Sequence, residues 1–411
     1  MQHSIEPGLQ RSLSLTLVTF YGIGTILGAG IYVLVGKVAG EAGMAAPLSF
    51  LIASLLAGFS AFSYAELSSR YPQSAGEAVY IQQAFGKQQL SMLMGFLIVA
   101  IGMVSTATLV HGFTGYLNVF FELPAILVQL LVISTLGIIV AWGIGQSVII
   151  ASVLTVLEII GLLIILWVTR NNLLLAPASI ETLLPVADSS IWIGVMAGAF
   201  VAFYAFVGFE DIVNVAEEVV QPQINLPRAI IISLVVTTVL YFLVSTASVM
   251  SVSPESLAQS DAPLVMIYEQ QTGRPATVIA LISVLSVLNG ALVQVVMASR
   301  VLYGMSHQGW IPRFFGRVHP VSRTPVIATA LVSGAILVLV LCLPILSLAK
   351  ITSFITLLVF SLINLALLII KLGGEKHHAF SVPVWVPLMG FAVCASFVSF
   401  QAYRYLFHQG G

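Results

Sequence analysis

The sequence predicts an all-α integral membrane protein, because three observations fit no soluble fold class. Of the 411 residues, 59% are hydrophobic and 8% are charged, with a mean hydropathy of +1.07, whereas a soluble domain is typically about 25% charged. Apolar runs of about 20 residues, long enough to cross a hydrocarbon core, recur along the whole chain. Two of these runs carry glycines or acidic residues at their centres, which indicates interrupted membrane helices.

Eleven apolar segments are long enough to be spanning helices, and short loops join them. The segments are 13–39, 45–69, 90–117, 124–142, 147–169, 191–217, 228–252, 276–305, 326–344, 347–371 and 384–408. We therefore expect a single membrane domain over residues 1–411, with no soluble domain.

Basic residues favour a cytoplasmic N-terminus through the positive-inside rule. In that orientation ten of them lie on the cytoplasmic side, namely Arg11, Arg70, Lys87, Arg228, Arg300, Arg313, Arg317, Arg323, Lys371 and Lys376. Five lie outside, namely Lys37, Arg170, Arg274, Lys350 and Arg404. Eleven spans then place the C-terminus outside, and we expect a multi-pass protein of the plasma (inner) membrane.

Composition and motifs argue against several functional classes. The 15 basic and 16 acidic residues lie mostly in short loops, so no nucleic-acid partner is expected. No Walker loop follows a strand and no nucleophile–base constellation occurs, so we expect neither an enzyme nor ATP-driven transport within this chain. Cys342 and Cys394 lie in apolar segments and indicate no disulfide framework. We expect no cofactor and no metal site.

The first segment contains the stretch "GIGTILGAGIY", residues 22–32, with four glycines near the centre of a spanning helix. In lipid, an interrupted helix is tolerated only where its free amides and carbonyls are buried in protein or line a cavity. The alternative is tight helix packing, because Gly24 and Gly28 have the spacing of membrane helix contacts, as do Gly36 and Gly40. This segment alone leaves both interpretations open.

The sixth segment contains "FYAFVGFEDIVNVAEEV", which places Gly208, Glu210 and Asp211 in an apolar run where charge is costly and usually functional. Two interrupted segments five helices apart indicate an inverted-repeat transporter with its site at the two interruptions. The repeats would cover about 13–169 and 191–371, with an additional helix over about 384–408.

Four blocks of sequence resemble the amino acid-polyamine-organocation (APC) permeases in the same order and spacing. They are "GIGTILGAGIYVLVG", "AELSSRYPQSAGEAVYIQQAFG", "FYAFVGFEDIVNVAEEVVQPQINLPRAI" and "SRVLYGMSHQGWIPRFFGRVHPVSRTPVIA". The resemblance implies a LeuT-like 5+5 inverted repeat with helices 1 and 6 broken. It also implies secondary active transport of an amino acid or related amine by alternating access. Most relatives have twelve or more spans, whereas we expect eleven here.

The dipoles of the helix ends suit the two charged groups of an amino acid. A half-helix beginning near Gly28 presents free amides and a positive end, which favours a carboxylate. A half-helix ending near Val207 presents free carbonyls and a negative end, which favours an ammonium group. By resemblance, Gly28, Ala29 and Gly30 correspond to the carboxylate-binding triplet of the family. Gly30 must be small for the ligand to approach the backbone.

Other residues of the two interrupted segments are expected to complete this site. Ile26 and residues 204–207 would supply carbonyls and walls. Tyr204 and Phe206 would be pocket walls or a gate, with plain helix packing as the alternative. Ser105 in the third segment would line the cavity or bond to its own helix.

Glu158 lies at the centre of the fifth segment, near the bilayer midplane. A carboxylate there is costly enough that it should face the bundle interior. The position resembles one where some proton-coupled APC relatives carry a lysine that stands in for a sodium ion between helices 1, 5 and 8. A glutamate must instead bind a proton, pair with bound sodium or contact a cationic substrate.

Reversible protonation of Glu158 is the simplest interpretation, because no basic residue lies within the other spanning centres. We therefore expect a transported proton, with sodium coupling or exchange as alternatives. In a purely structural alternative, a protonated Glu158 hydrogen-bonds to Ser283 or Ser286 of the eighth segment. Glu210 is a rival proton site or a pH-sensitive gate.

Two features lie at cytoplasmic helix ends. Glu66 lies where solvent, Arg70 or Arg228 could neutralise it, which favours loop structure or an inner gate over substrate contact. The stretch "GEAVYIQQAFG", residues 76–86, is typical of a short amphipathic cytoplasmic helix.

A substrate-sensing receptor or a channel with the same fold is the alternative to transport. Selectivity depends on walls contributed by several helices, so the sequence leaves open which amino acid or amine binds. It also leaves open the direction of transport, the oligomeric state and any partner subunit. The lipid bilayer and a small-molecule substrate are the expected partners.

Overall fold

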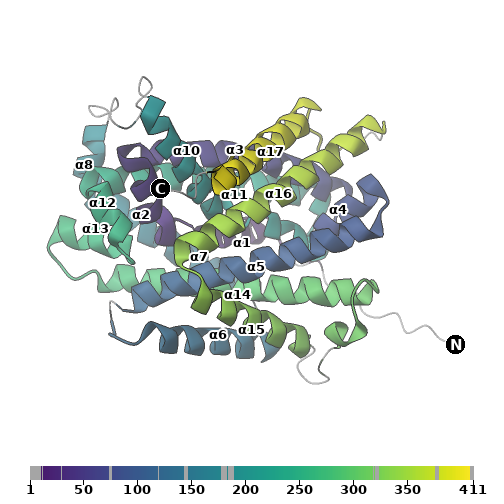
Figure 1. Cartoon of the computed structure of the whole chain (residues 1–411), viewed down its shortest axis with the longest axis horizontal. Helices are drawn as coiled ribbons and strands as arrows, with labels where there is room; N and C mark the ends of the chain where they lie inside the picture. Colours follow the sequence, from purple (N-terminus) through teal and green to yellow (C-terminus); the bar gives the residue numbers. More distant parts are fainter. Residues whose placement is uncertain are drawn as a thin grey trace.

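The computed structural model of the chain is a bundle of α-helices (Figure 1). It describes residues 11, 13–28, 30–73, 76–118, 120–142, 147–176, 183, 189–317, 319, 324–374 and 379–407. Within these residues there is no β-strand, and β pairing is limited to an isolated bridge between Leu13 and Val219. The prediction of an all-α protein is confirmed.

Helical structure coincides with each of the eleven predicted segments. The longer helices are α1 (Leu15–Leu27), α2 (Ile31–Ala42), α3 (Ala46–Arg70), α5 (Gln88–Leu117), α6 (Ala125–Trp142), α7 (Ser147–Val168), α10 (Ser189–Phe203), α11 (Pro222–Ser251), α14 (Thr277–His307), α15 (Val326–Cys342), α16 (Ile345–Leu372) and α17 (Trp385–Phe407). The shorter elements are η1 (Gly43–Ala45), α4 (Gly76–Phe85), α8 (Arg170–Leu175), η3 (Tyr204–Phe206), η4 (Phe209–Glu218), α12 (Pro254–Gln259), α13 (Pro263–Thr272) and η5 (Arg313–Gly316). The loop helix predicted over residues 76–86 forms as α4.

Within the described residues, eight helical stretches are long and apolar enough to cross a membrane. In this measure α2 and α3 run on as one stretch, Ile31–Arg70, and α1, α6 and α15 are apolar but shorter. These helices support a multi-pass membrane protein. The count of eleven spans stays a prediction.

Local sequence signals set several helix ends. Ser14 caps α1, because its hydroxyl accepts a hydrogen bond from the Leu17 amide at 3.3 Å. α11 begins with Pro222, whose missing amide hydrogen has no partner to lose in the first turn. α13 ends before Gly273, which adopts a φ of +64°, a left-handed conformation that glycine readily takes.

Helices that are distant in the sequence pack together in the core. α5 lies alongside α14 and α16, and α3 lies against α10 and α11 (Figure 1). α1 packs against α7, α11 and α14. Small residues allow the close approach of α5 to α14, since a Cβ atom on Gly102 would lie 3.0 Å from the Cβ of Ala298. The end of α1 is therefore surrounded by helices from both halves of the chain.

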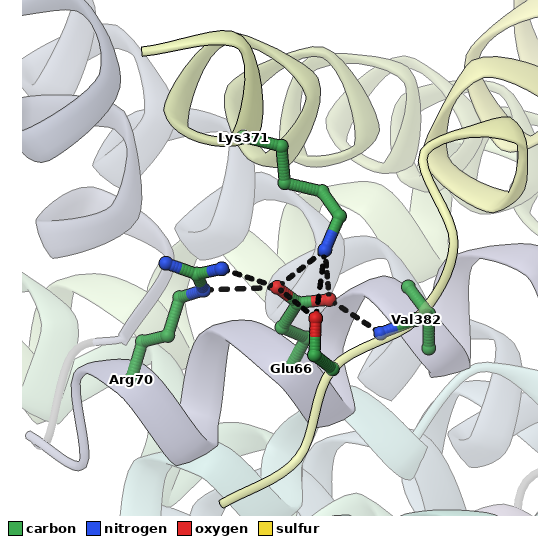
Figure 2. Close-up of polar contacts among 5 residues, drawn as sticks. Glu66, Arg70, Lys371 and Val382 are labelled. Carbon is green, nitrogen blue, oxygen red and sulfur yellow. Dashed lines mark hydrogen bonds and ion pairs between the residues drawn. The ribbon is translucent and has the colours of Figure 1, made fainter. Parts of the chain in front are cut away.

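A buried ion cluster at Glu66 ties the end of α3 to α16 and to the segment before α17 (Figure 2). The fully buried Glu66 accepts hydrogen bonds from Arg70 Nε at 2.9 Å and from Lys371 Nζ at 2.7 Å. Its other oxygen accepts the Val382 amide at 2.7 Å. Arg70 was one expected partner, and the second cation is Lys371, 305 residues away. The carboxylate is saturated by donors and fixes three segments together.

We expect Glu66→Gln to lower the free energy of unfolding by about 3 kcal/mol or more, because Arg70 and Lys371 would keep buried charges without a counter-charge. The matched control is Glu41→Gln, which breaks an ion pair with Lys350 whose side chains are 25% and 33% exposed. Such exposed pairs contribute about 1 kcal/mol or less. Thermal unfolding of the purified variants measures the difference, and equal losses would contradict a structural role for the cluster.

Candidate functional site

The first helix interruption lies between α1 and α2. α1 stops at Leu27 and α2 starts at Ile31, which leaves Gly28 and Gly30 between them. Ala29, the middle residue of the predicted triplet, lies outside the described residues. The Gly30 amide donates to the Leu27 carbonyl at 3.3 Å, which is long for a backbone hydrogen bond. The regular hydrogen-bond ladder therefore stops at the glycines that the sequence singled out.

The second interruption follows α10. Helix α10 stops at Phe203, Val207 is extended with a ψ of 129°, and Gly208 has a φ of +132°. Only glycine takes that φ readily. A Cβ atom on Gly208 would also lie 2.6 Å from the Thr25 carbonyl oxygen. Gly208 is thus required both by its own backbone and by the close approach of α1.

The two interruptions lie directly against each other. The Thr25 hydroxyl donates to the Gly208 carbonyl at 2.9 Å. A Cβ atom on Gly30 would collide with the backbone of Ala205, whose carbonyl oxygen would be 2.8 Å away. This contact supports the packing interpretation of Gly30 in this conformation. The ligand interpretation requires the two segments to separate.

Two backbone carbonyls, one from each interruption, converge on the hydroxyl of Tyr241 in α11. The Tyr241 Oη lies 2.7 Å from the Ile26 oxygen and 2.9 Å from the Ala205 oxygen. A hydroxyl has one hydrogen to donate, so it cannot serve both carbonyls fully at once. The C-terminal end of α1 adds negative potential at this place. A donor with several hydrogens, such as an ammonium group, would suit the two carbonyls better.

The predicted wall residues Tyr204, Phe206 and Val207 are all buried. The Tyr204 hydroxyl lies 3.0 Å from the Ser105 hydroxyl of α5, so Ser105 turns toward the second interruption. The Phe206 ring packs edge-on against the ring of Tyr241, with centroids 5.1 Å apart. Contacts from α5 and α11 therefore hold the predicted walls beside the converging carbonyls.

Glu158 of α7 is 1% exposed. One carboxylate oxygen lies 3.4 Å from the Asn289 side-chain amide of α14, and the other has no hydrogen-bond partner within the described chain. Ser283 donates its hydroxyl to the Ile279 carbonyl of its own helix at 2.8 Å. The Ser286 hydroxyl lies near Glu158 without a hydrogen bond of good geometry. The hydrogen bond expected from Ser283 or Ser286 is thus replaced by a long contact from Asn289, a residue that the sequence analysis did not single out.

Glu158 and the first interruption are held by the same helices. A Cβ atom on Gly28 would lie 2.9 Å from the Ser286 carbonyl oxygen and 3.3 Å from the Gly290 amide, so α14 passes beside Gly28. Tyr32 of α2 donates its hydroxyl to the backbone carbonyl of Glu158 at 2.5 Å. A change at the Glu158 carboxylate can therefore reach the predicted substrate site through direct contacts.

Glu210 is bonded to the second interruption. It is 7% exposed, and its carboxylate accepts the Gly208 amide at 2.8 Å. This bond satisfies an amide that the interrupted helix leaves free. A change in the charge of Glu210 would act directly on the backbone of the second interruption.

Comparison with known proteins matches residues 13–405 to the family model described as amino acid permease. The branched-chain amino acid permease BcaP of Bacillus subtilis is 28% identical over 416 residues, which covers 94% of this chain and 87% of that protein. The vacuolar cationic amino acid transporter 4 of Arabidopsis thaliana is 29% identical over 384 residues, covering 88% of this chain and 64% of that protein. The methylthioribose transporter of Bacillus subtilis is 28% identical over 422 residues, covering 96% and 89%. The chain thus spans less than two thirds of the length of the Arabidopsis protein.

We expect Tyr241→Phe to lower the free energy of unfolding by about 1–3 kcal/mol, because two buried carbonyls would lose their shared donor. The aromatic contact with Phe206 is kept, so the variant isolates the hydroxyl. Tyr268→Phe on α13 is the matched control, since Tyr268 is only partly buried. Thermal unfolding measures both variants, and losses of the same size would show that the Tyr241 bridge contributes nothing.

Proposed function

Because this chain belongs to the amino acid permease family, we propose that it is a secondary active transporter that moves an amino acid or a related amine across a membrane by alternating access. The family match also confirms the resemblance to the APC permeases. The observation that most directly supports substrate binding is the convergence of the Ile26 and Ala205 carbonyls between two facing helix interruptions.

The substrate would bind between the two interruptions, through its two charged groups. The amides of Gly28, Ala29 and Gly30 would hold the carboxylate at the positive end of α2. The Gly28 amide donates to the Gly24 carbonyl at 3.0 Å in this conformation, so it must leave that bond to contact the substrate. The carbonyls of Ile26 and Ala205 would hold the ammonium group, at the negative end of α1 and beside α10. This arrangement uses backbone groups alone for the features that all amino acids share.

Selectivity for the side chain would come from the walls. Tyr204, Phe206 and Val207 supply aromatic and aliphatic surface next to the converging carbonyls. Because the two interruptions touch in this structure, a bound substrate requires them to move apart. Such a movement is what alternating access demands of the two halves of a carrier.

For the fold we propose the LeuT-like 5+5 inverted repeat with eleven transmembrane helices, of which the first and sixth are broken. The two interruptions, five predicted segments apart, support this arrangement. The repeats and the additional helix would be 13–169, 191–371 and 384–408. We place the protein in the plasma (inner) membrane, with the N-terminus in the cytoplasm and the C-terminus outside, on the basic-residue bias.

For the driving ion we propose a proton carried by Glu158. The carboxylate is buried, its described partner is the neutral Asn289 amide, and one of its oxygens is unpaired within the described chain. Burial without a cation favours the neutral, protonated form. Sodium coupling and exchange are the alternatives, and Glu210 is the rival proton site.

The relatives differ in what their names say they carry: branched-chain amino acids, cationic amino acids and methylthioribose. A thermal-shift screen against amino acids and amines is the way to find the ligand, since a ligand at 100 times its Kd stabilises the folded protein by about 2.7 kcal/mol.

We expect the purified protein in proteoliposomes to catalyse counterflow, in which labelled ligand from that screen enters in exchange for unlabelled ligand trapped inside. Alternating access predicts this trans-stimulation, because a carrier loaded with substrate reorients faster than an empty carrier. A substrate-sensing receptor would bind without exchange, and a channel would equilibrate the label without trans-stimulation. Either of those two results would replace the transporter proposal.

We expect Gly30→Leu to abolish binding of the ligand, because the leucine side chain would fill the place of the carboxylate against Ala205. Gly334→Leu on α15 is the matched control, since nothing lies within 4 Å of a Cβ atom at Gly334. Size-exclusion elution checks that each variant folds. A folded Gly30→Leu protein with wild-type affinity would refute the site, and Gly30→Ala serves the same comparison if the leucine variant does not fold.

We expect Glu158→Gln to lose accumulation of substrate driven by an imposed pH gradient, because the amide cannot exchange a proton at this position. Uptake into sodium-free proteoliposomes compares wild type, Glu158→Gln and Glu210→Gln, with counterflow as the measure of intact transport. Gradient-driven accumulation by Glu158→Gln, or a sodium requirement in wild type, contradicts the assignment. If only Glu210→Gln loses gradient-driven accumulation, Glu210 is the proton site instead of Glu158.

A further inference from the structure

A small enclosed cavity with a volume of about 10 Å³ lies among three carboxylates that the proposed mechanism does not use together. That volume is the size of about one water molecule. The polar residues that line it are Tyr64 of α3, Glu77 of α4, and Glu210 and Asp211 of η4. The apolar residues that line it are Ile98, Ile101, Met297, Val359 and Phe360.

The three carboxylates are buried, and none of them is paired with a cation within the described residues. Glu77 is 2% exposed and Asp211 also 2%. Asp211 accepts the side-chain amide of Gln294 at 2.9 Å, and Glu210 accepts the Gly208 amide. The ion pairs found within the described residues involve Glu66 and Glu41, and none involves these three carboxylates.

Three further polar atoms at this place are buried without a hydrogen-bond partner in the described part of the chain. They are the hydroxyl of Tyr64, a residue that lines the cavity, the hydroxyl of Tyr80 beside Glu77, and the side-chain oxygen of Gln294. Tyr64 is fully buried, and its ring packs edge-on against the rings of Phe209 and Phe360, with centroids 5.7 and 5.4 Å away. Buried polar atoms are nearly always hydrogen-bonded, so an unpaired hydroxyl on a residue that lines the cavity indicates a further hydrogen-bond partner at this place.

The chemistry of the cluster favours protons over a metal ion. Three buried negative charges without a cation would be far too costly, so the carboxylates must take up positive charge or protons. Within the described chain no three acidic, histidine or cysteine side chains are close enough to hold a metal ion together. Separate protonation of each carboxyl group needs no such convergence, and the Tyr64 hydroxyl can donate to or accept from a carboxyl group.

Glu77 differs from the other two because it lies on the loop helix α4, outside the predicted spans. Burial, reinforced by the negative charge of Glu210, raises the pKa of the Glu77 carboxyl to about 8. The group is therefore neutral below that pH and ionises just above the physiological range. The titratable groups that face it are Tyr80 on its own helix, Tyr64 on α3, and Glu210 and Asp211 on η4. The α5 and α16 residues that line the cavity are apolar.

We propose that Glu77, Glu210 and Asp211 form a proton-binding cluster on the cytoplasmic side of the substrate site, and that Glu77 is the member that exchanges its proton with the cytoplasm. The cluster is separate from Glu158, and its assignment to the cytoplasmic side rests on the proposed function and orientation. Glu210 links it to the second interruption through the Gly208 amide. Proton uptake at Glu77 would thus reach the backbone that borders the substrate.

Infrared difference spectroscopy of the purified protein tests proton binding without any transport. We expect wild type to show the C=O stretch of a protonated carboxyl that disappears near the Glu77 pKa of about 8 as the pH is raised. Glu77→Gln should lose this component, and Glu255→Gln, at an exposed glutamate of α12, should keep it. A spectrum unchanged in Glu77→Gln overturns the proposal. So does loss of the component in wild type when sodium chloride is added at constant pH, which would indicate a metal cation.

The second test measures transport in proteoliposomes. We expect Glu77→Gln to lose accumulation driven by a pH gradient while its counterflow matches that of Glu255→Gln. Unchanged accumulation overturns the link between the cluster and coupling. Absence of counterflow in wild type would refute the transporter proposal instead, and the infrared result would still decide proton binding. If Glu77→Gln does not fold, Glu77→Met takes its place in both measurements, because it removes the same carboxyl group with an apolar side chain of similar size.

Discussion

The absence of hydrogen-bond partners in the bilayer core is the constraint on which this structure depends, because every interrupted helix must satisfy its backbone inside the protein. The two interruptions do so largely through each other and their neighbours. Thr25 donates to Gly208, Tyr241 bridges Ile26 and Ala205, and the Gly208 amide is bonded to Glu210. These bonds press the two segments together. A substrate that separates them must replace the same bonds, and the carboxylate and ammonium groups of an amino acid have the donors and acceptors to do so.

Buried carboxylates in this chain fall into two physical classes that predict different behaviour. Glu66 is saturated by two cations and a backbone amide, so its charge is fixed and it acts as an anchor for three segments (Figure 2). Glu77, Glu210 and Asp211 form no ion pair within the described residues, and the partners of Glu210 and Asp211 there are neutral amides. Their charge can change with little rearrangement of salt bridges. The same residue type thus serves as a structural anchor beside cations and as a titratable group away from them.

Glu158 belongs to the second class but occupies a different place. Its partner Asn289 precedes Gly290, whose amide lies beside Gly28, so the carboxylate and the first interruption share α14 as a neighbour. Each carboxylate therefore lies near a different interruption: Glu158 shares α14 with the first, and Glu210 is bonded to the Gly208 amide of the second. In the proposed transporter, a carboxylate at each interruption would give protons a physical route to bias both halves of the site.

The all-helical class, the positions of the apolar helices and the loop helix α4 could be predicted from the sequence, which also pointed to the glycine-containing stretches at residues 22–32 and 204–211. These features follow from local properties: the length of apolar runs, the positive φ that glycine allows at Gly208, and the cost of charge among apolar residues. It also singled out Glu158, Glu210 and the Tyr204–Val207 stretch as candidates. Which groups meet depends on the tertiary structure. Lys371 pairs with Glu66 across 305 residues, and Tyr241 reaches Ile26 across 215. Asn289 approaches Glu158, and Gly30 packs on Ala205. Such pairings depend on how helices from distant parts of the chain cross and rotate against one another, and local periodicity carries no record of those angles.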